Sequence, residues 1–187
     1  MTAAADPPFD PDELAGIVDL FGALTPAELE RALSELAFKR GTDLADDAVA
    51  AAVDEAVRSY ALVRYARDAA AAADGDPARD ATAAEDGPGD RTLLAPGPAA
   101  FPTLPPNAED LPHILAVDSR DVDRETAAEA LAERFRADAA RAASAGDDAE
   151  IRRLLDLTYD VAVWAESIDI DDVRDRLDAA LDDSPRA

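Results

Sequence analysis

The stretch LLAPGPAAFPTLPPNAEDLPHIL, residues 93–115, decides the fold, because it is where a densely charged chain stops being charged. Six of the thirteen prolines lie in it, and its only formal charges are Glu109 and Asp110. Proline restricts the backbone and supplies no amide donor, so we expect an ordered extended segment that neither a helix nor a central strand crosses. A solvated linker would be polar, whereas this segment carries Leu93, Leu94, Phe101, Leu104, Leu111, Ile114 and Leu115. We therefore expect flanking helices to pack around it, as a structural spine or a docking surface.

The chain outside this segment is strongly acidic, with 42 acidic and 18 basic residues and a net charge of -24 over 187 residues. Lys39 is the only lysine. This composition resembles that of proteins from extreme halophiles, in which molar salt shortens the Debye length to about 3 Å and weakens the repulsion between surface charges. The alternative interpretation is a basic partner or mimicry of nucleic acid. Dispersal of the charge along the whole chain favours salt adaptation.

Several classes of protein are disfavoured by what the sequence lacks. The chain has no cysteine, which excludes disulfides, cysteine-bound zinc and thiol catalysis, and fits a reducing compartment. Its N-terminus has no signal-peptide pattern, and no apolar run reaches the length of a membrane helix. These features predict a cytoplasmic protein that does not enter the membrane.

Two capping boxes mark the first helices. Asp10 is followed by Pro11 and by Glu13 at the third helical position, and Thr25 is followed by Pro26 and Glu28 in the same order. A third helix is expected to start at Asp46 or Asp47 and to end at Arg58, with valines spaced four residues apart on one face.

The residues after the third helix allow two interpretations. Residues 59–66, SYALVRYA, are rich in aromatic and β-branched side chains, which favours a strand, with residues 91–95 as its partner. No Gly or Pro intervenes before Gly75, however, so a helix that continues through Tyr60 and Arg64 is the alternative. Residues 67–90 have no large apolar side chain, so we expect a mobile loop between the two strands.

The second half is predicted to be helical. One helix begins near Asp121 or Asp123, buries Leu131 and Phe135, and ends at Gly146. A second helix follows a cap at Asp147 or Asp148, and a third covers roughly residues 172–181. The expected organisation is a tail (1–9), a first domain (10–95), a proline-rich connector (96–117) and a domain of three helices (118–183).

Three helices followed by a hairpin with a long tip resemble the winged-helix domain in the order of their elements. The resemblance would make residues 46–58 the recognition helix and residues 67–90 the tip of the wing. Arg58, Arg64 and Arg67 could then contact a DNA backbone. The third helix nevertheless carries four acids and one Arg, so phosphate would be repelled from it. The expected fold class is mainly α, with a winged-helix-like first half and a helical second half.

Three stretches are distinctive: LTPAELERALSELAFKRG (24–41), PGPAAFPTLPPNAEDLPHIL (96–115) and LLDLTYDVAVWA (154–165). In these stretches the chain resembles an uncharacterised family of haloarchaeal proteins. The resemblance implies a halophilic cytoplasmic origin, and it implies no activity.

No catalytic, metal or cofactor signature stands out. His113, the single histidine, would need Glu109 or Asp110 to act as a general base, but a lone histidine among apolar neighbours is more often a packing residue. DDVRD, residues 171–175, matches a magnesium-binding pattern of prenyl-chain synthases, yet it has no second acidic motif to face it. We expect no enzyme activity and no cofactor.

The sequence thus favours a non-enzymatic module that binds a protein partner or another copy of itself. Phe101, Leu104 and His113 are the candidate contact residues. The alternative is a transcription regulator that binds DNA at high salt through Arg58, Arg64 and Arg67.

Overall fold

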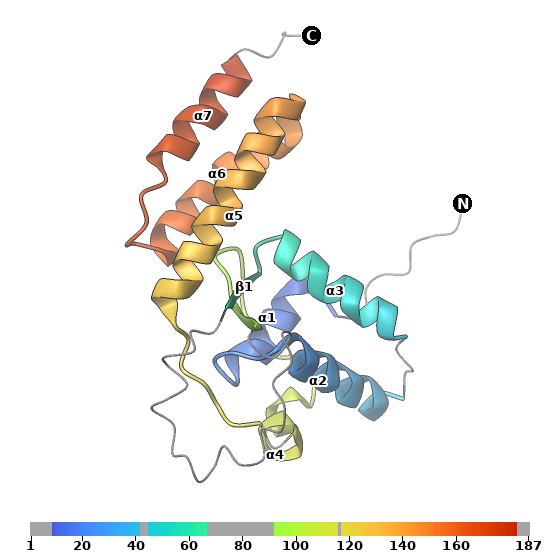
Figure 1. Cartoon of the computed structure of the whole chain (residues 1–187). Helices are drawn as coiled ribbons and strands as arrows, with labels where there is room; N and C mark the ends of the chain where they lie inside the picture. The colour runs from blue at the N-terminus through green and yellow to red at the C-terminus, as the bar shows by residue number, and fades with distance from the viewer. Residues whose placement is uncertain (1–8, 42–44, 67–91, 116, 183–187) are drawn as a thin grey trace, which may run out of the picture. The chain divides into compact units, whose positions relative to one another are not determined.

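The computed structural model describes residues 9–41, 45–66, 92–115 and 117–182, and it divides into two compact units, residues 1–123 and 124–187. Seven α-helices and one antiparallel pair of strands make up the described part (Figure 1). The expected fold class, mainly helical with a hairpin, is confirmed. The predicted mobile loop, residues 67–90, lies outside the described residues.

Three helices open the first unit: α1 (Pro11–Asp19), α2 (Pro26–Lys39) and α3 (Asp46–Arg58). Both predicted capping boxes form, at Asp10 and at Thr25. The structure buries Phe9 in the core, with the guanidinium of Arg40 over its ring, although the sequence had placed it in the tail. The core therefore starts just before the first cap.

A hairpin follows, β1 (Leu62–Ala66) paired with β2 (Thr92–Pro96), with Arg64 opposite Leu94 in the register. The strand interpretation of residues 59–66 is thus confirmed, and the continued helix is wrong. Tyr60 adopts a left-handed conformation, φ 68°, which separates α3 from the strand. Leu24, between α1 and α2, also bridges to Leu94 through hydrogen bonds in both directions. The first and second helices are tied to the hairpin at that point.

The end of the proline-rich stretch forms η3 (Ala108–Asp110) and α4 (Leu111–Leu115), which corrects the expectation that no helix would form there. Pro112 is the second residue of α4, where a missing amide donor costs no helical hydrogen bond. The expectation that no central strand would cross the stretch is also corrected, because β2 is hydrogen-bonded on one side to β1 and on the other to Leu24. The stretch therefore begins as a strand, has no regular secondary structure over residues 97–107, and ends in two short helices.

The core of the first unit lies between these helices and one face of the hairpin. The elements that supply it are α1, α2, α3, both strands, η3 and α4, through residues such as Leu14, Ile17, Phe21, Leu33, Val53, Leu62, Leu94 and Leu111. The connector expected at 96–117 therefore contributes side chains to this core, and it belongs to the first unit.

The second unit consists of α5 (Arg124–Ala145), α6 (Asp148–Trp164) and α7 (Asp171–Asp182), each of which packs against the other two (Figure 1). Leu131 and Phe135 of α5 are buried, as expected, and so are Val173 and Leu177 of α7. Asp147 caps α6 by accepting a hydrogen bond from the Glu150 amide, and Gly146 before it has φ 64°.

Candidate interaction surface

Residues 101–104 lie along α1 and are fixed there by their backbone. The Phe101 amide donates to Oδ1 of Asp12 at 2.9 Å, and the Thr103 amide donates to the Asp12 carbonyl at 3.1 Å. A Cβ on Gly16 would lie 2.0 Å from the Thr103 carbonyl oxygen, so only glycine permits this approach. The residue between the two bonded amides is Pro102, which has no amide to satisfy. The segment is thus held rigidly although it has no regular secondary structure.

The side chains of this segment point away from the core. Phe101 is 78% exposed and Leu104 is 49% exposed, whereas Leu93, Leu94, Leu111 and Leu115 of the same stretch are buried. All four residues from 101 to 104 are exposed. The apolar side chains of the stretch therefore divide between the core and the solvent, and the solvent-facing ones are Phe101 and Leu104 and, on α4, Ile114, which is 41% exposed. We call residues 101–104 the exposed segment.

His113 lies on α4 and is exposed. Within the described residues, no hydrogen bond or ion pair joins it to Glu109 or Asp110; Asp110 pairs instead with Lys39 at 3.5 Å. The structure gives His113 no carboxylate to orient it as a base. Likewise, no hydrogen bond among the described residues joins His113 on α4 to Phe101 or Leu104 of the exposed segment.

The arginines of the DNA alternative are paired with acids of α3. Arg58 bonds Glu55, one turn earlier, and Arg64 of β1 bonds Oδ1 of Asp54 at 3.3 Å. Arg67 lies outside the described residues. Exposed pairs of this kind are weak individually, but a phosphate would have to displace a carboxylate at each of the two positions.

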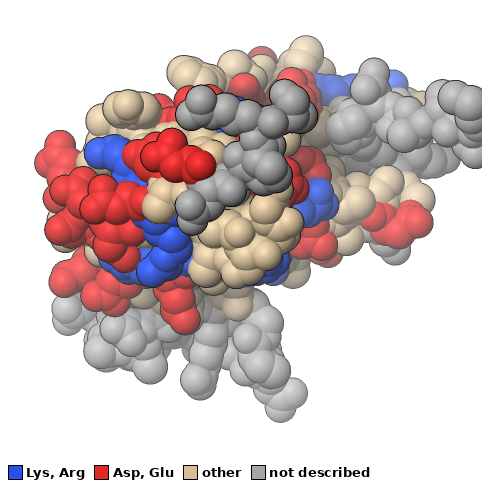
Figure 2. Space-filling model, turned by 90° about the horizontal axis from the view of Figure 1, so that it is seen from above, with Lys and Arg blue, Asp and Glu red and all other residues tan. Residues whose placement is uncertain are grey.

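The same pairing extends to all six basic residues described in the first unit. Besides Arg58 and Arg64, three bond a carboxylate or a backbone carbonyl: Arg31 the Leu115 carbonyl, Lys39 Asp110, and Arg120 Glu28. Arg40 lies 3.9 Å from Oε1 of Glu13, as an ion pair without a hydrogen bond. Figure 2, which draws one face of the whole chain and not of this unit alone, shows blue basic side chains among red acidic ones. Acids outnumber bases on the described part of this unit, and five of its six described basic residues pair with a carboxylate, Arg31 being the exception.

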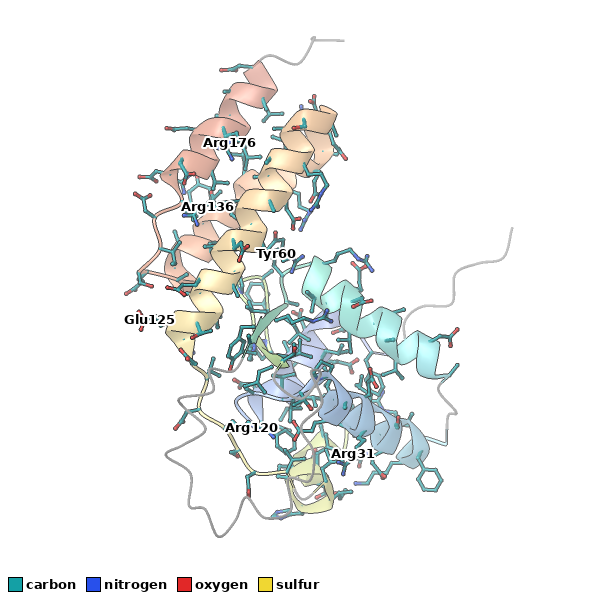
Figure 3. All side chains as sticks on the ribbon, in the orientation of Figure 1. Arg31, Tyr60, Arg120, Glu125, Arg136 and Arg176 are labelled. Carbon is teal, nitrogen blue, oxygen red and sulfur yellow. The ribbon has the colours of Figure 1, made fainter. Side chains whose placement is uncertain are left out.

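Arg120 makes the most extensive of these contacts. Its Nη1 and Nη2 bond the two carboxylate oxygens of Glu28 at 2.6 and 2.7 Å, and Nη1 also bonds the Ala23 carbonyl (Figure 3). Its amide bonds the Phe21 carbonyl at 2.8 Å, close to Gly22, where a Cβ would lie 2.0 Å from the Arg120 carbonyl oxygen. This bidentate pair fastens the chain after α4 to the turn between α1 and α2.

The environment of Glu28 shifts its acidity. Burial alone raises the pKa of Glu28, but the hydrogen bonds and charge of Arg120, together with the Thr25 amide and hydroxyl, outweigh burial and leave the pKa below its ordinary value. The sequence identified Glu28 as part of a capping box and gave no sign of Arg120, because no local spacing relates residues so far apart.

In the second unit the exposed apolar side chains are Tyr159 and Val163, one turn apart on α6 and 69% and 77% exposed. The guanidinium of Arg174 lies 5.3 Å from the centre of the Tyr159 ring and bonds the Thr158 hydroxyl. Arg136, labelled in Figure 3, bonds the Asp169 carbonyl just before α7. Arg174 and Arg136 thus both join helices of the bundle.

The acidic motif at residues 171–175 forms the first turn of α7. Asp171 pairs with Arg174, and Asp172 pairs with Arg136. Among the described residues of the whole chain, no group of three or more potential ligands is placed to hold a metal ion. No described helix is long and apolar enough to cross a membrane.

These features define a mainly helical chain of two units with an acidic surface and a short exposed apolar segment fixed on its first helix. The chain belongs to DUF7109, a family of unknown function whose model matches residues 12–182. The expectation of an uncharacterised family is confirmed at that level. No curated protein and no solved structure matches the chain.

Proposed function

We propose that this protein is a non-enzymatic, halophilic cytoplasmic module that binds another protein or a second copy of itself. The observation that carries the proposal is the exposed segment, in which Phe101 and Leu104 present apolar side chains on a backbone fixed by Asp12. Binding to a fixed segment avoids the entropy cost of ordering a loop. Phenylalanine is also among the aromatic residues that are enriched at protein interfaces.

The order of elements supports a winged-helix-like first unit. Three helices precede an antiparallel hairpin, and the connection from α1 to α2 is bridged to the second strand at Leu24. A fold of this class is compatible with many functions, so the function has to be argued from the surface.

That surface favours a protein partner over DNA. DNA-binding proteins gain most of their affinity from Lys and Arg against phosphate, and here Arg58 and Arg64 are bonded to Glu55 and Asp54. Molar salt would weaken the repulsion by these acids, and it would equally remove the gain from released counterions. Regulation of transcription remains the alternative function, supported by the order of elements alone.

The test is affinity purification of the tagged protein in molar potassium chloride from the lysate of its own cells, with and without nuclease. We expect a protein partner that survives nuclease treatment and is lost from the Phe101→Ser, Leu104→Ser variant. Phe38→Ser is the matched control, because Phe38 is 80% exposed on α2 and does not belong to the segment. Circular dichroism of each variant shows whether the fold is intact.

Two results would contradict the proposal. Capture of a specific DNA fragment only in the untreated half would favour the regulator. A partner retained equally by wild type and the Phe101→Ser, Leu104→Ser variant would mean that binding takes place at another surface.

A further inference from the structure

The exposed segment lies directly beside an acidic side chain. Asp12 accepts the Phe101 amide through Oδ1, and within the described residues no Lys or Arg pairs with its carboxylate. Asp12 as a residue is half-buried, but its hydrogen bond to the Phe101 amide lies at the exposed surface, where a cation from solvent can reach the carboxylate. Two more acidic residues are nearby: Asp10 is the N-cap of α1, and Glu13 lies in its first turn next to Asp12. An apolar patch and a carboxylate thus adjoin each other on a rigid backbone.

The charge of the chain discriminates between the two kinds of partner left open by the proposed function. A second copy would bring the same net charge of -24 and the same acidic first helix to the contact. Each basic residue described in this unit already has a partner within it, so a second copy could use one of these six only by breaking an existing contact. Charge complementarity therefore favours a different, basic chain.

We propose that the exposed segment, together with Asp12, docks a basic polypeptide segment in which an apolar anchor is flanked by Arg or Lys. The apolar anchor packs on Phe101 and Leu104, and the cation pairs with the Asp12 carboxylate. Arginine suits this position better than lysine, because its guanidinium is more weakly hydrated and forms directed hydrogen bonds to carboxylate. This inference rests on the proposed function and names the chemistry of its partner.

The experiment is a selection from a random peptide pool on the immobilised full-length protein in molar potassium chloride. Peptides retained by the Phe101→Ser, Leu104→Ser variant are removed first, so that the remainder report on the exposed segment. We expect enriched peptides with a large apolar residue beside Arg or Lys. Their affinity should fall about tenfold in Asp12→Asn, as for the loss of one charge-assisted hydrogen bond.

Asp19→Asn is the matched control, because it removes the same charge from an exposed position at the other end of α1. Asparagine at position 12 retains an oxygen that can accept the Phe101 amide, so the fold of the segment is kept. Equal losses in the two variants would mean that net charge alone attracts the peptide, and they would overturn the proposed pairing with Asp12.

The inference also fails if the enriched peptides are acidic or uncharged, or if none distinguishes wild type from the counter-selection variant. If the lysate yields a partner that depends on Phe101 while the selected peptides lack Arg and Lys, the inference fails and the proposed function stands. If the lysate yields no such partner, the proposed function fails independently of the peptides. Enrichment of peptides copied from this chain would identify self-association and overturn the basic partner.

Discussion

At the scale of single residues, the pair of Glu28 and Arg120 is the contact whose removal should cost most among the ion pairs. Each side chain is largely covered, with 17% and 27% exposure, and two short hydrogen bonds join them. We expect Glu28→Ala to lower the free energy of unfolding by about 2 to 3 kcal/mol, since it removes charge-assisted bonds and one half of a capping box.

The measurement is urea denaturation of wild type, Glu28→Ala, Arg120→Ala and the double variant. Contacting residues should show a coupling energy of about 1 kcal/mol or more. Arg153→Ala, which breaks an exposed pair with Glu150 on α6, is the control and should cost well under about 1 kcal/mol. Strictly additive losses at Glu28 and Arg120 would show that the pair contributes nothing to stability.

The lowered pKa of Glu28 predicts a dependence of stability on pH. A carboxyl group whose pKa is lower in the folded state stabilises the fold when pH is above the unfolded pKa, about 4.3 for glutamate. That contribution is lost as pH falls through the folded pKa. We expect the difference in unfolding free energy between wild type and Glu28→Gln to be constant near neutral pH and to shrink at acid pH. A difference that grows on acidification would contradict the assigned direction.

The residues that cap helices could be recognised in the sequence, whereas the partner of Glu28 could not. Asp10, Thr25 and Asp147 act within three residues of their own amide partners, so their spacing is visible along the chain. Arg120 is 92 residues from Glu28, and no sequence spacing around it marks it as the partner of that carboxylate. His113 shows the converse: it is conspicuous in the sequence, but no carboxylate of the described residues bonds it.

At the scale of elements, the contact between α1 and the exposed segment depends on Gly16. Glycine within a helix normally costs about 1 kcal/mol relative to alanine. Here a Cβ would lie 2.0 Å from the Thr103 carbonyl oxygen and 2.9 Å from its amide nitrogen, and both are backbone atoms that cannot rotate away. We expect Gly16→Ala to destabilise the protein by about 1 to 3 kcal/mol despite its better helix propensity.

Thermal and urea denaturation measure this effect, and hydrogen exchange of the Phe101 and Thr103 amides locates it. Both amides should exchange faster in Gly16→Ala, because the segment has to move off α1. Ser34→Ala is the control: it lies at an exposed position of α2, so it measures the gain in helix propensity without a steric clash with another segment. A stabilised Gly16→Ala protein with unchanged exchange would mean that the segment does not lie against α1.

The proline-rich stretch shows how far a local pattern determines an element. Its uncharged, apolar character correctly indicated order, because Leu94 and Leu111 fill the core. The inference that prolines prevent any helix failed at Pro112, since a proline is harmless at the start of a helix. Which apolar side chains face solvent could not be predicted, because that depends on Gly16 and Asp12 at the other end of the unit.

At the scale of the whole molecule, the net charge of -24 predicts that stability requires salt. The Debye length is about 10 Å at 0.1 M salt and about 3 Å at 1 M, so repulsion between neighbouring carboxylates is long-ranged only in dilute buffer. We expect the free energy of unfolding to rise by at least about 2 kcal/mol from dilute to molar potassium chloride, as self-repulsion is screened. Urea denaturation at a series of salt concentrations measures this rise.

Salt also strengthens apolar burial, so the electrostatic part has to be isolated by a charge change. Asp175, Asp178 and Asp182 on α7 are exposed and carry no ion pair within the described residues. Their replacement by Asn removes three negative charges. It should stabilise the protein in dilute buffer, where these carboxylates are repelled by the rest of the acidic surface, and should have little effect in molar salt. If the triple variant and wild type show the same salt dependence, burial accounts for the effect of salt, and the acidic surface then needs another explanation, such as recognition of a basic partner.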